Sequence, residues 1–373
     1  SMYTESARLK EKYGAENVYD FGMGNPNLPA PDSIRETSIR VLQETDPWYL
    51  HHYMPNNGFP EAREKIAASL NRRFGEHFDA NNIMMCTGAA GGLNCLLKVL
   101  MDPGQEILTF APYFGEYDRY ADNVGCTLTT VPPNIPTFQP DPAALEKCVT
   151  EKTRAVLIDN PNNPTGALMS RELLGRIIEV ARSVDAYVLC DEVYRNLTQE
   201  DGWCESIVDL YEKGISVSSM SKVFSLAGLR MGWIATHDKQ ALRAFLSHRD
   251  YNLISCGMFD DAVSALALRH ADALLRRNRT IVRENLAILD AWIADTPHFY
   301  YTKPQAGTTA LVYYDFDVPS YEFCKRLYDE TGAFVTPGDC FEQPRSMRIG
   351  YACDEKTLED GLAALARFAE TLG

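Results

Sequence analysis

Short apolar runs alternate with longer helix-like segments between about residues 83 and 236. Within each run consecutive positions are apolar, which is typical of strands that are covered on both faces. Two intervening segments, 91–101 and 170–184, have the pattern of amphipathic helices, and Ser170 is placed to cap the second. The alternation therefore predicts an α/β fold with a mostly parallel sheet and helices on both sides. The expected strands are 82–87, 105–112, 154–160, 186–194, 215–221 and 231–236.

The pattern changes near residue 267. A long arginine-rich helical stretch, 267–295, leads to two strand-like segments, 308–316 and 347–352. The first 45 residues hold no complete strand–helix–strand unit, so we expect them to join this second region. One continuous domain would also fit the chain length. We favour two domains: a large one over 46–266, and a smaller α+β one formed by 1–45 and 267–373.

Composition and charge narrow the class of protein. The 373 residues carry a net charge of −15, which opposes binding to nucleic acid. No apolar run reaches the roughly 18 to 20 residues that a membrane helix needs, and the first residues lack the apolar core of a signal peptide. The ten cysteines form no C-x-x-C pair, and the seven histidines have no metal-ligand spacing. We expect a cytoplasmic protein with free thiols, no membrane segment and no metal.

Polar residues at the ends of the expected strands are the first place to look for chemistry, because ligands bind beyond the carboxyl ends of parallel strands. The segment "TGAAGGL" (87–93) follows a strand and opens a helix, where backbone N–H groups can hold a phosphate. A tight strand-to-helix turn would explain it equally well. The segment "DNPNNPTG" (159–166) leaves Asn163 able to donate a hydrogen bond, although a simple Pro/Asn/Gly turn accounts for it too.

Two further strands end in charged or hydroxyl groups. "CDEVY" (190–194) places Asp191 and Tyr194 there, and the carboxylate could either cap a turn or face a buried cation. "SVSSMSKVFSLAGLRMGW" (216–233) contains Ser219, Lys222 and Arg230. Most lysines and arginines are surface residues. If the hydroxyl and guanidinium hold a phosphate, Lys222 is instead a buried amine whose pKa is lowered, as a Schiff-base lysine requires.

Taken together and in this order, the segments "NPNNPTG", "CDEVY" and "SMSK", with Arg230 eight residues beyond the lysine, resemble the class I/II aminotransferases. These are pyridoxal-phosphate (PLP) enzymes of fold type I. The resemblance extends from about residue 20 to residue 352. It implies that the large domain contains a sheet of the seven-stranded type. It also implies an enzyme that moves the amino group of an L-amino acid to a 2-oxo acid.

The resemblance also implies roles for individual residues at the cofactor. Lys222 forms the aldimine with PLP and carries the substrate Cα proton, and Asp191 pairs with the pyridine nitrogen. Tyr194 and Asn163 hydrogen-bond the phenolic oxygen of the ring. Tyr113 matches the aromatic residue that stacks on the ring, although an ordinary core tyrosine would look the same. The phosphate is held by Ala89, Ala90, Ser219 and Arg230.

Substrate binding and assembly follow from the same resemblance. Arg348 in "SMRIGYA" corresponds to the arginine that grips the substrate α-carboxylate, which a guanidinium suits better than an ammonium. Arg345 lies nearby, but the spacing to "IGYA" favours Arg348. Gly24 matches a glycine whose backbone assists at that carboxylate. Tyr53 matches a tyrosine that reaches the phosphate in the neighbouring subunit, which implies a homodimer with shared active sites.

Other readings of the same motifs remain. Carbon–sulfur β-lyases and other aminotransferase-like enzymes share them. A lyase would release pyruvate and ammonia from a thiol-bearing substrate without an oxo-acid acceptor. A ligand-sensing module of a transcription regulator is disfavoured by the charge and by the lack of room for a DNA-binding domain before residue 20. The substrate stays open: Arg249 or Arg119 could bind a second carboxylate, whereas Tyr49 and Tyr53 could line a pocket for an apolar side chain.

Overall fold

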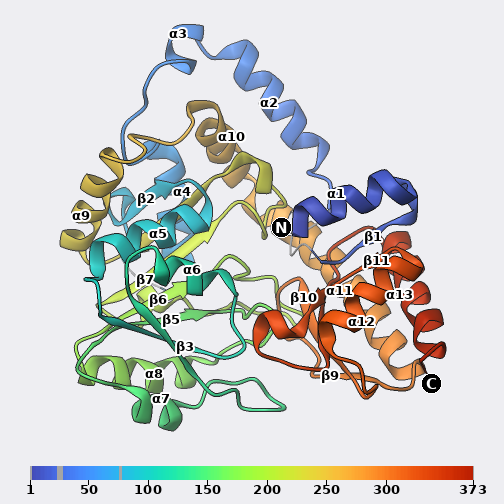
Figure 1. Ribbon diagram of the computed structural model, residues 1–373. Coiled ribbons are helices and arrows are strands. Elements are labelled where there is room, and N and C mark those ends of the chain that lie inside the picture. Colours follow the sequence, from blue (N-terminus) through green and yellow to red (C-terminus); the bar gives the residue numbers. More distant parts are fainter. Residues whose placement is uncertain (1, 23–27, 75–77, 373) are drawn as a thin grey trace.

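The computed structural model describes residues 2–22, 28–74 and 78–372 (Figure 1). Its larger sheet has seven strands in the order β2-β8-β7-β6-β5-β3-β4. Only β8 runs antiparallel to its neighbours in this sheet, so the predicted mostly parallel sheet is confirmed. The strands are β2 (Ile83–Cys86), β3 (Glu106–Phe110), β4 (Thr127–Val131), β5 (Thr153–Asp159), β6 (Tyr187–Asp191), β7 (Gly214–Ser219) and β8 (Gly232–Thr236).

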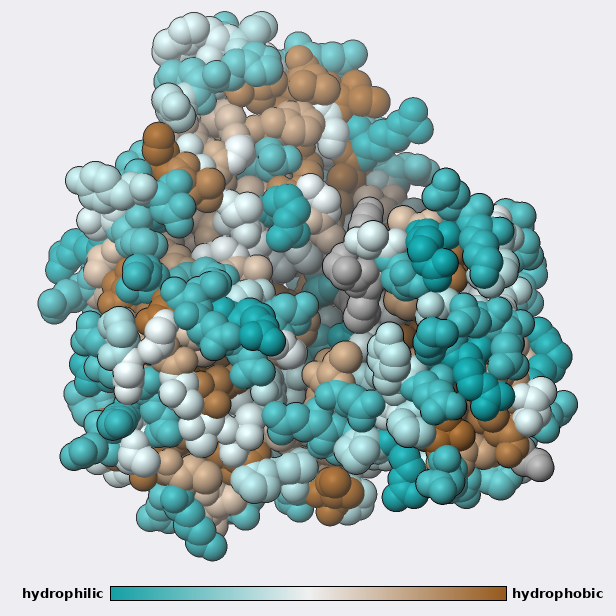
Figure 2. Space-filling view, in the orientation of Figure 1, coloured by the Kyte–Doolittle hydropathy of each residue, from teal (hydrophilic) through white to brown (hydrophobic). Residues whose placement is uncertain are grey.

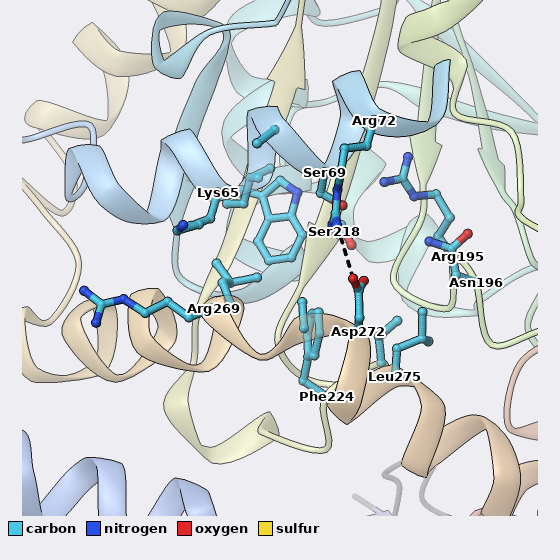
Figure 3. Close-up of a pocket in the computed structure, with 16 residues that line it drawn as sticks. Lys65, Ser69, Arg72, Arg195, Asn196, Ser218, Phe224, Arg269, Asp272 and Leu275 are labelled. Atoms are coloured by element: carbon cyan, nitrogen blue, oxygen red, sulfur yellow. Dashed lines mark hydrogen bonds and ion pairs between the residues drawn. The ribbon is translucent and has the colours of Figure 1, made fainter. Parts of the chain in front are cut away.

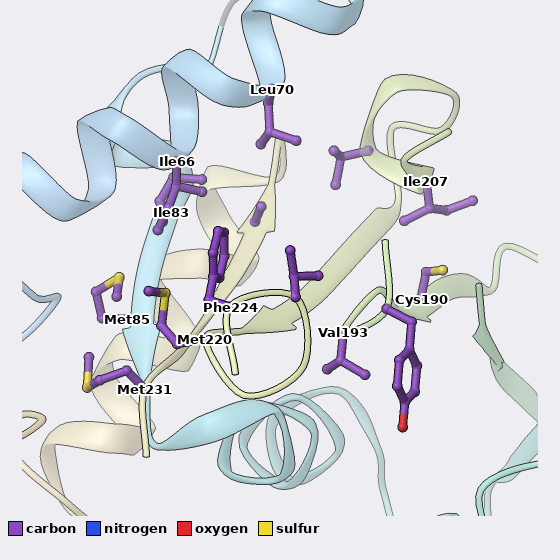
Figure 4. Packing of buried hydrophobic residues seen from close by; sticks show 14 of the residues in the cluster. Ile66, Leu70, Ile83, Met85, Cys190, Val193, Ile207, Met220, Phe224 and Met231 are labelled. Carbon is purple, nitrogen blue, oxygen red and sulfur yellow. The ribbon is translucent and has the colours of Figure 1, made fainter. Parts of the chain in front are cut away.

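Helices cover both faces of this sheet, because successive strand residues point to opposite sides. In β5, Val156 and Ile158 join a core with α4, α7, α8 and α10, which Figure 4 shows in part. Ala155 and Leu157 join a second core with α5, α6 and α9. The helices are α4 (Pro60–Phe74), α5 (Gly88–Leu100), α6 (Glu116–Asp122), α7 (Pro142–Cys148), α8 (Arg171–Ser183), α9 (Lys239–Asp250) and α10 (Met258–Arg269).

The sequence pattern located most of these elements and missed one strand. The Ser170 side chain accepts a hydrogen bond from the Leu173 N–H, which confirms the predicted cap of α8. The edge strand β4 was not expected, because its sequence "TLTTV" is partly exposed and lacks the apolar run of a central strand. The helical stretch expected over 267–295 is two helices, since α10 ends at Arg269 and α11 begins at Ala271.

A second unit is built on an antiparallel sheet in the order β12-β13-β10-β9, with its own apolar core. In Figure 1 this unit lies to the right of the larger sheet. A separate pair of short strands, β1 and β11, runs parallel beside it. The elements are α1 (Met2–Tyr13), β1 (Tyr19–Asp20), α11 (Ala271–Asp295), β9 (Phe299–Tyr301), β10 (Thr309–Tyr314), α12 (Ser320–Thr331), β11 (Ala333–Phe334), β12 (Thr336–Pro337), β13 (Ser346–Gly350) and α13 (Glu355–Glu370).

The first 45 residues contact both units. Strand β1 pairs with β11, as expected for a segment that joins the smaller unit. Helix α2 (Asp32–Glu44) instead contacts α10, and its Ile34 and Val41 belong to the apolar core of the large sheet. The division at residues 45 and 267 therefore stays a prediction. The remaining elements are α3 (Pro47–Leu50) and the short 3-10 helices η1 (Ala15–Asn17), η2 (Ala80–Asn82), η3 (Ile207–Asp209), η4 (Ala227–Leu229) and η5 (Gly338–Phe341).

The surface in Figure 2 is hydrophilic over much of the face shown. Within the described residues, no helix combines the length and apolar character that crossing a membrane requires. Large apolar side chains are exposed in several short segments: Ile39, Leu42, Trp48, Tyr49, Tyr53, Tyr251, Leu253 and Ile254.

Candidate active site

A cavity of about 790 Å³ opens where β5, β6 and β7 end. Both units contribute to its wall, because Thr336, Phe341 and Arg348 come from the smaller one. Most of the predicted site residues border this cavity, although they are spread over 260 positions of the chain. Those that do are Ala89, Ala90, Asn163, Asp191, Tyr194, Ser219, Lys222, Arg230 and Arg348.

One end of the cavity is suited to an anion. Helix α5 begins there at Gly88, and its N-cap Thr87 makes no side-chain capping hydrogen bond, so the first N–H groups of the helix stay available. Gly88 has a φ of +64°, and a Cβ built on it would lie 2.5 Å from a guanidinium nitrogen of Arg230. This close approach brings the helix start and the guanidinium together on one small volume. A phosphate group fits that arrangement.

Lys222 follows β7 and borders the same cavity. Its Nζ lies 6.0 Å from the centre of the Tyr194 ring. The pKa of Lys222 is lowered to about 8, chiefly by burial and also by the charges of Arg348 and Arg230, while the carboxylates of Asp191 and Glu116 act in the opposite direction. An amine with such a pKa is partly neutral near pH 7, as a nucleophilic lysine must be.

Two buried carboxylates stand side by side at the strand ends. Asp159 of β5 and Asp191 of β6 are paired across the parallel ladder, and each is 6% exposed. Burial raises the pKa of Asp191 to about 6, although the Val193 N–H, the Tyr117 hydroxyl and Lys222 favour its charged form. The Tyr117 hydroxyl donates to Asp191 Oδ2 at 3.1 Å. A cation such as a protonated ring nitrogen would compensate the charge of Asp191.

Asp159 has a different environment from Asp191. It accepts hydrogen bonds from the Asn163 N–H at 2.9 Å and from Asn162 Nδ2 at 2.8 Å. Burial raises the pKa of Asp159 to about 7 against these two donors, and the nearby Asp191 raises it as well. The carboxyl group thus holds the Asn162–Asn163 turn against the end of its own strand.

Arg348 enters the cavity from β13 and is 5% exposed. Its guanidinium donates to Asn163 Oδ1 at 3.2 Å, to the Gly22 carbonyl at 2.6 Å and to Thr336 Oγ1 at 3.2 Å. Nε is buried without a hydrogen-bond partner among the described residues. These contacts fix the guanidinium plane, and a carboxylate would fit an arginine held in this way. Arg345, in contrast, is exposed and does not border the cavity.

The aromatic wall differs from the expectation at one residue. Tyr113 is buried, its hydroxyl bonds Glu342 at 3.3 Å, and it is not among the residues that border the cavity. Its neighbour Phe114 borders the cavity instead, together with Tyr117 and Tyr120. Tyr113 and Phe114 are adjacent in the loop that follows β3, and only Phe114 borders the cavity. The sequence "APYFGEY" does not indicate which of the two rings faces the ligand.

Two other expected residues, Tyr53 and Arg249, do not border the cavity in this single chain. Tyr53 is 74% exposed and lies outside the lining. Gly24 falls outside the described residues. Arg249 is buried elsewhere against the Met85 carbonyl. Arg119 does border the cavity, but its Nη1 binds Asp122 Oδ2 at 2.9 Å.

Several residues of the wall were not singled out from the sequence. Ser221 belonged to the "SMSK" segment, and Tyr117 and Glu116 to "APYFGEY", so their segments were recognised without their individual roles. Thr336, Cys340 and Phe341 carry no motif, and only the packing of the smaller unit brings them here. Across the residues described, no cluster of His, Cys, Asp or Glu could hold a metal ion, and all ten cysteines are unpaired.

Comparison with known proteins agrees with this geometry. Residues 15–365 match the family described as aminotransferase class I and II. The chain is 27% identical to the aspartate aminotransferase of Bacillus subtilis, over 98% of this chain and 95% of that protein. A PLP-dependent aminotransferase from Streptococcus suis shares 32% identity with a TM-score of 0.88, covering 99% of this chain and 97% of that one. An aromatic aminotransferase from Pyrococcus horikoshii shares 26% identity with a TM-score of 0.89, covering 98% and 99% of the two chains.

The fold and the family match define a PLP-dependent enzyme of fold type I, as predicted. The chain belongs to the class I and II aminotransferases. Its cofactor is PLP, and its substrates are an amino acid and a 2-oxo acid.

Proposed function

We propose that this aminotransferase holds PLP covalently at Lys222 and binds the substrate α-carboxylate at Arg348. The observation that carries the proposal is a lysine with a pKa of about 8, enclosed between a buried carboxylate, Asp191, and the anion site at Arg230. When bound, PLP supplies an electron sink for the electrons of a broken bond at the substrate Cα.

The protein's own groups then have separate tasks. Lys222 Nζ, neutral above pH 8, takes the proton from the substrate Cα and returns a proton later. Asp191 Oδ2, fixed by Tyr117, favours a protonated ring nitrogen. The first turn of α5, Ser219 and Arg230 bind the phosphate. Tyr194 and Asn163, which border the same cavity, bind the phenolic oxygen.

The half-reaction tests this function. Purified enzyme with PLP is mixed with single amino acids, and absorbance and products are followed. Transamination predicts loss of the visible cofactor band with one 2-oxo acid formed per site and no need for an acceptor. Continuous release of pyruvate and ammonia from a thiol-bearing amino acid, with the band retained, would favour the β-lyase instead.

For the donor side chain, we propose an apolar or aromatic group. Phe114, Tyr120 and Phe341 form an apolar wall, and Glu116 in the same wall would repel a second carboxylate. Arg119 is the remaining arginine of this wall beside Arg230 and Arg348, and its side chain is 78% exposed, so it lies mostly in solvent. A larger kcat/KM for aspartate than for phenylalanine or tyrosine would contradict this proposal.

The role of Arg348 has a matched control three residues away. In Arg348→Lys, the planar fork is lost and KM for the amino acid should rise about 10- to 100-fold, with a smaller change in kcat. Arg345→Lys removes an exposed guanidinium outside the cavity and should leave both constants near those of the wild type. Equal effects of the two substitutions on KM would point to another carboxylate anchor.

We also propose a homodimer with shared active sites, in the cytoplasm, and the domain division at residues 45 and 267. Exposed apolar side chains at Trp48, Tyr49, Tyr53, Tyr251 and Leu253 support a covered surface in the assembly. The ten unpaired cysteines support a reducing compartment. The separate apolar cores of the two sheets support the division.

A further inference from the structure

A second cavity, of about 340 Å³, lies between α4 and the junction of α10 with α11 (Figure 3). Segment 218–224 forms part of the wall of both cavities. Ser219, Ser221 and Lys222 border the candidate active site, whereas Ser218, Val223 and Phe224 border the second cavity. A group that fills the second cavity therefore lies close to Val223, which is directly bonded to Lys222 in the chain.

The second cavity has an apolar floor with two aromatic residues. Phe224 is buried, Trp233 is partly buried, and both border the space. Ile66, Leu268 and Leu275 complete the apolar part. A volume of this size lies near the lower end of the roughly 300 to 1,000 Å³ that is usual for small-molecule sites. It suits a ligand of one or two rings.

Basic side chains gather at the rim of the cavity in a chain whose net charge is −15. Two of them are paired with carboxylates outside the lining, Arg195 with Glu192 at 3.4 Å and Arg269 with Glu61 at 2.6 Å. Four basic side chains border it, against a single carboxylate, that of Asp272; the basic residues are Lys65, Arg72, Arg195 and Arg269. Arg72 Nη1 binds Asp272 Oδ2 at 3.1 Å, and Figure 3 shows this pair joining α4 to the start of α11. Both side chains are about half exposed, so the pair is weak and a ligand carboxylate can replace Asp272 at little cost.

We propose that this cavity binds a small aromatic carboxylate and that its occupancy is coupled to Lys222 through segment 218–224. The ring contacts Phe224 and Trp233, and the carboxylate takes the place of Asp272 on Arg72. The site goes beyond the proposed transaminase function and does not depend on it, because none of its ligand contacts belongs to the candidate active site.

Trp233 provides the first test. In the enzyme with PLP bound, Trp48, Trp203 and Trp292 are replaced by Phe so that Trp233 alone reports, and phenylacetate is titrated in. We expect a saturable change in Trp233 emission, and binding at least about fivefold weaker for the uncharged phenylacetamide. The absence of a saturable response up to about 50 mM phenylacetate, or equal binding of the amide, would overturn the proposal.

Substitutions of the two partners in the Arg72–Asp272 pair should change phenylacetate affinity in opposite directions. Arg72→Gln should weaken phenylacetate binding about two- to fivefold, whereas Asp272→Asn should strengthen it by a similar factor because Arg72 is then released. Arg40→Gln, which removes an exposed ion pair with Glu44 on α2, serves as the control and should change nothing. If both cavity variants weaken binding, the pair only supports the structure and the proposal is wrong.

A third variant separates the two cavities. Arg348→Gln removes the carboxylate anchor of the candidate active site, so the Trp233 response should persist with its midpoint within about twofold. Loss of that response would place phenylacetate in the active site and overturn the proposal. In the same variant, saturating phenylacetate should move the pH midpoint of the visible cofactor band by about 0.3 or more, a twofold coupling. An unmoved midpoint would contradict the coupling to Lys222.

Discussion

At Lys222, burial and two arginines act against two carboxylates. Desolvation, Arg348 and Arg230 all disfavour the ammonium, and Asp191 and Glu116 favour it, with a resulting pKa of about 8 in place of 10.5. The proposed phosphate anchor, Arg230, and the proposed carboxylate anchor, Arg348, therefore also lower the pKa of the nearby amine. This coupling explains why a lysine stands at the end of a buried strand.

The pH dependence of cofactor loading follows from that pKa. The neutral fraction of Lys222 increases with pH up to and beyond about 8, so the visible band should form faster as the pH is raised from 6 to 9. Arg348→Gln removes a positive neighbour and should move the midpoint to higher pH. Stopped-flow absorbance after mixing apoprotein with PLP measures both, and a rate that is independent of pH over this range would contradict the assignment.

The adjacent rings of Tyr113 and Phe114 give a second prediction at this scale. Phe114→Ala removes the ring that borders the cavity and should weaken PLP binding by about tenfold, because an aromatic contact contributes roughly 0.5–1.5 kcal/mol beyond its buried area. Tyr113→Phe, which removes only the hydroxyl that bonds Glu342, should change PLP affinity by less than about twofold. Equilibrium dialysis measures both affinities, and an unchanged affinity in Phe114→Ala would contradict a contact between this ring and PLP.

Among the elements, those that form the site were largely predictable. Strands β5, β6, β7 and β8 are largely buried on both faces, so their apolar runs stand out. Strands β5, β6 and β7 end at Asp159, Asp191 and Ser219, which border the cavity. Strand β4 was not predicted, because an edge strand is partly exposed and does not need a continuous apolar run. The sequence did not predict that Phe114 rather than Tyr113 borders the cavity, for another reason. Both residues are aromatic, and the backbone of the loop after β3 decides which ring faces the cavity.

The paired ends of β5 and β6 predict how stability varies with pH. Asp159 and Asp191 release their protons near pH 7 and 6 in the folded protein and near 3.8 when unfolded. Between these values the folded state binds more protons, so their contribution to the stability of the apoprotein is present at low pH and is lost as the pH rises towards 7. Asp159→Asn removes one of the two groups and should reduce this loss by about 1–3 kcal/mol.

Urea unfolding of the apoprotein at pH 5 and pH 8 measures that difference. The variant should also be less stable at pH 5 by about 1 kcal/mol, since an amide can accept from only one of the two donors at Asn162 and Asn163. If the unfolding free energy changes equally between the two pH values in the wild type and the variant, the pKa of Asp159 is not raised in the folded protein.

For the whole molecule, the cavity needs both units, and its arginine anchor comes from the smaller one. The sequence motifs named Arg348 but could not show that the carbonyl of Gly22 and the side chain of Asn163, about 140 residues apart, hold its guanidinium. Such contacts depend on tertiary packing, which no local pattern encodes. Tyr53 lies outside the cavity of its own chain, which agrees with the proposal that it acts in the partner.

Hybrid dimers test that proposal. Tyr53→Ala and Arg348→Ala should each reduce activity strongly, and a mixed dimer should regain activity because one of its two sites then has both wild-type residues. The expected recovery is up to half of the wild-type rate per hybrid. If Tyr53 acts within its own subunit, neither site is intact and mixing the two variants should restore nothing.

The most direct test of the central claim is to find the residue that carries the cofactor. The holoenzyme is reduced with borohydride, digested and mapped by mass spectrometry, with Lys222→Ala and the exposed-lysine variant Lys147→Ala treated in parallel. The account predicts one pyridoxyl phosphate group on Lys222 in the wild type and in Lys147→Ala, and none at that position in Lys222→Ala. A stoichiometric label on another lysine of the wild-type enzyme, or none at all, would contradict it.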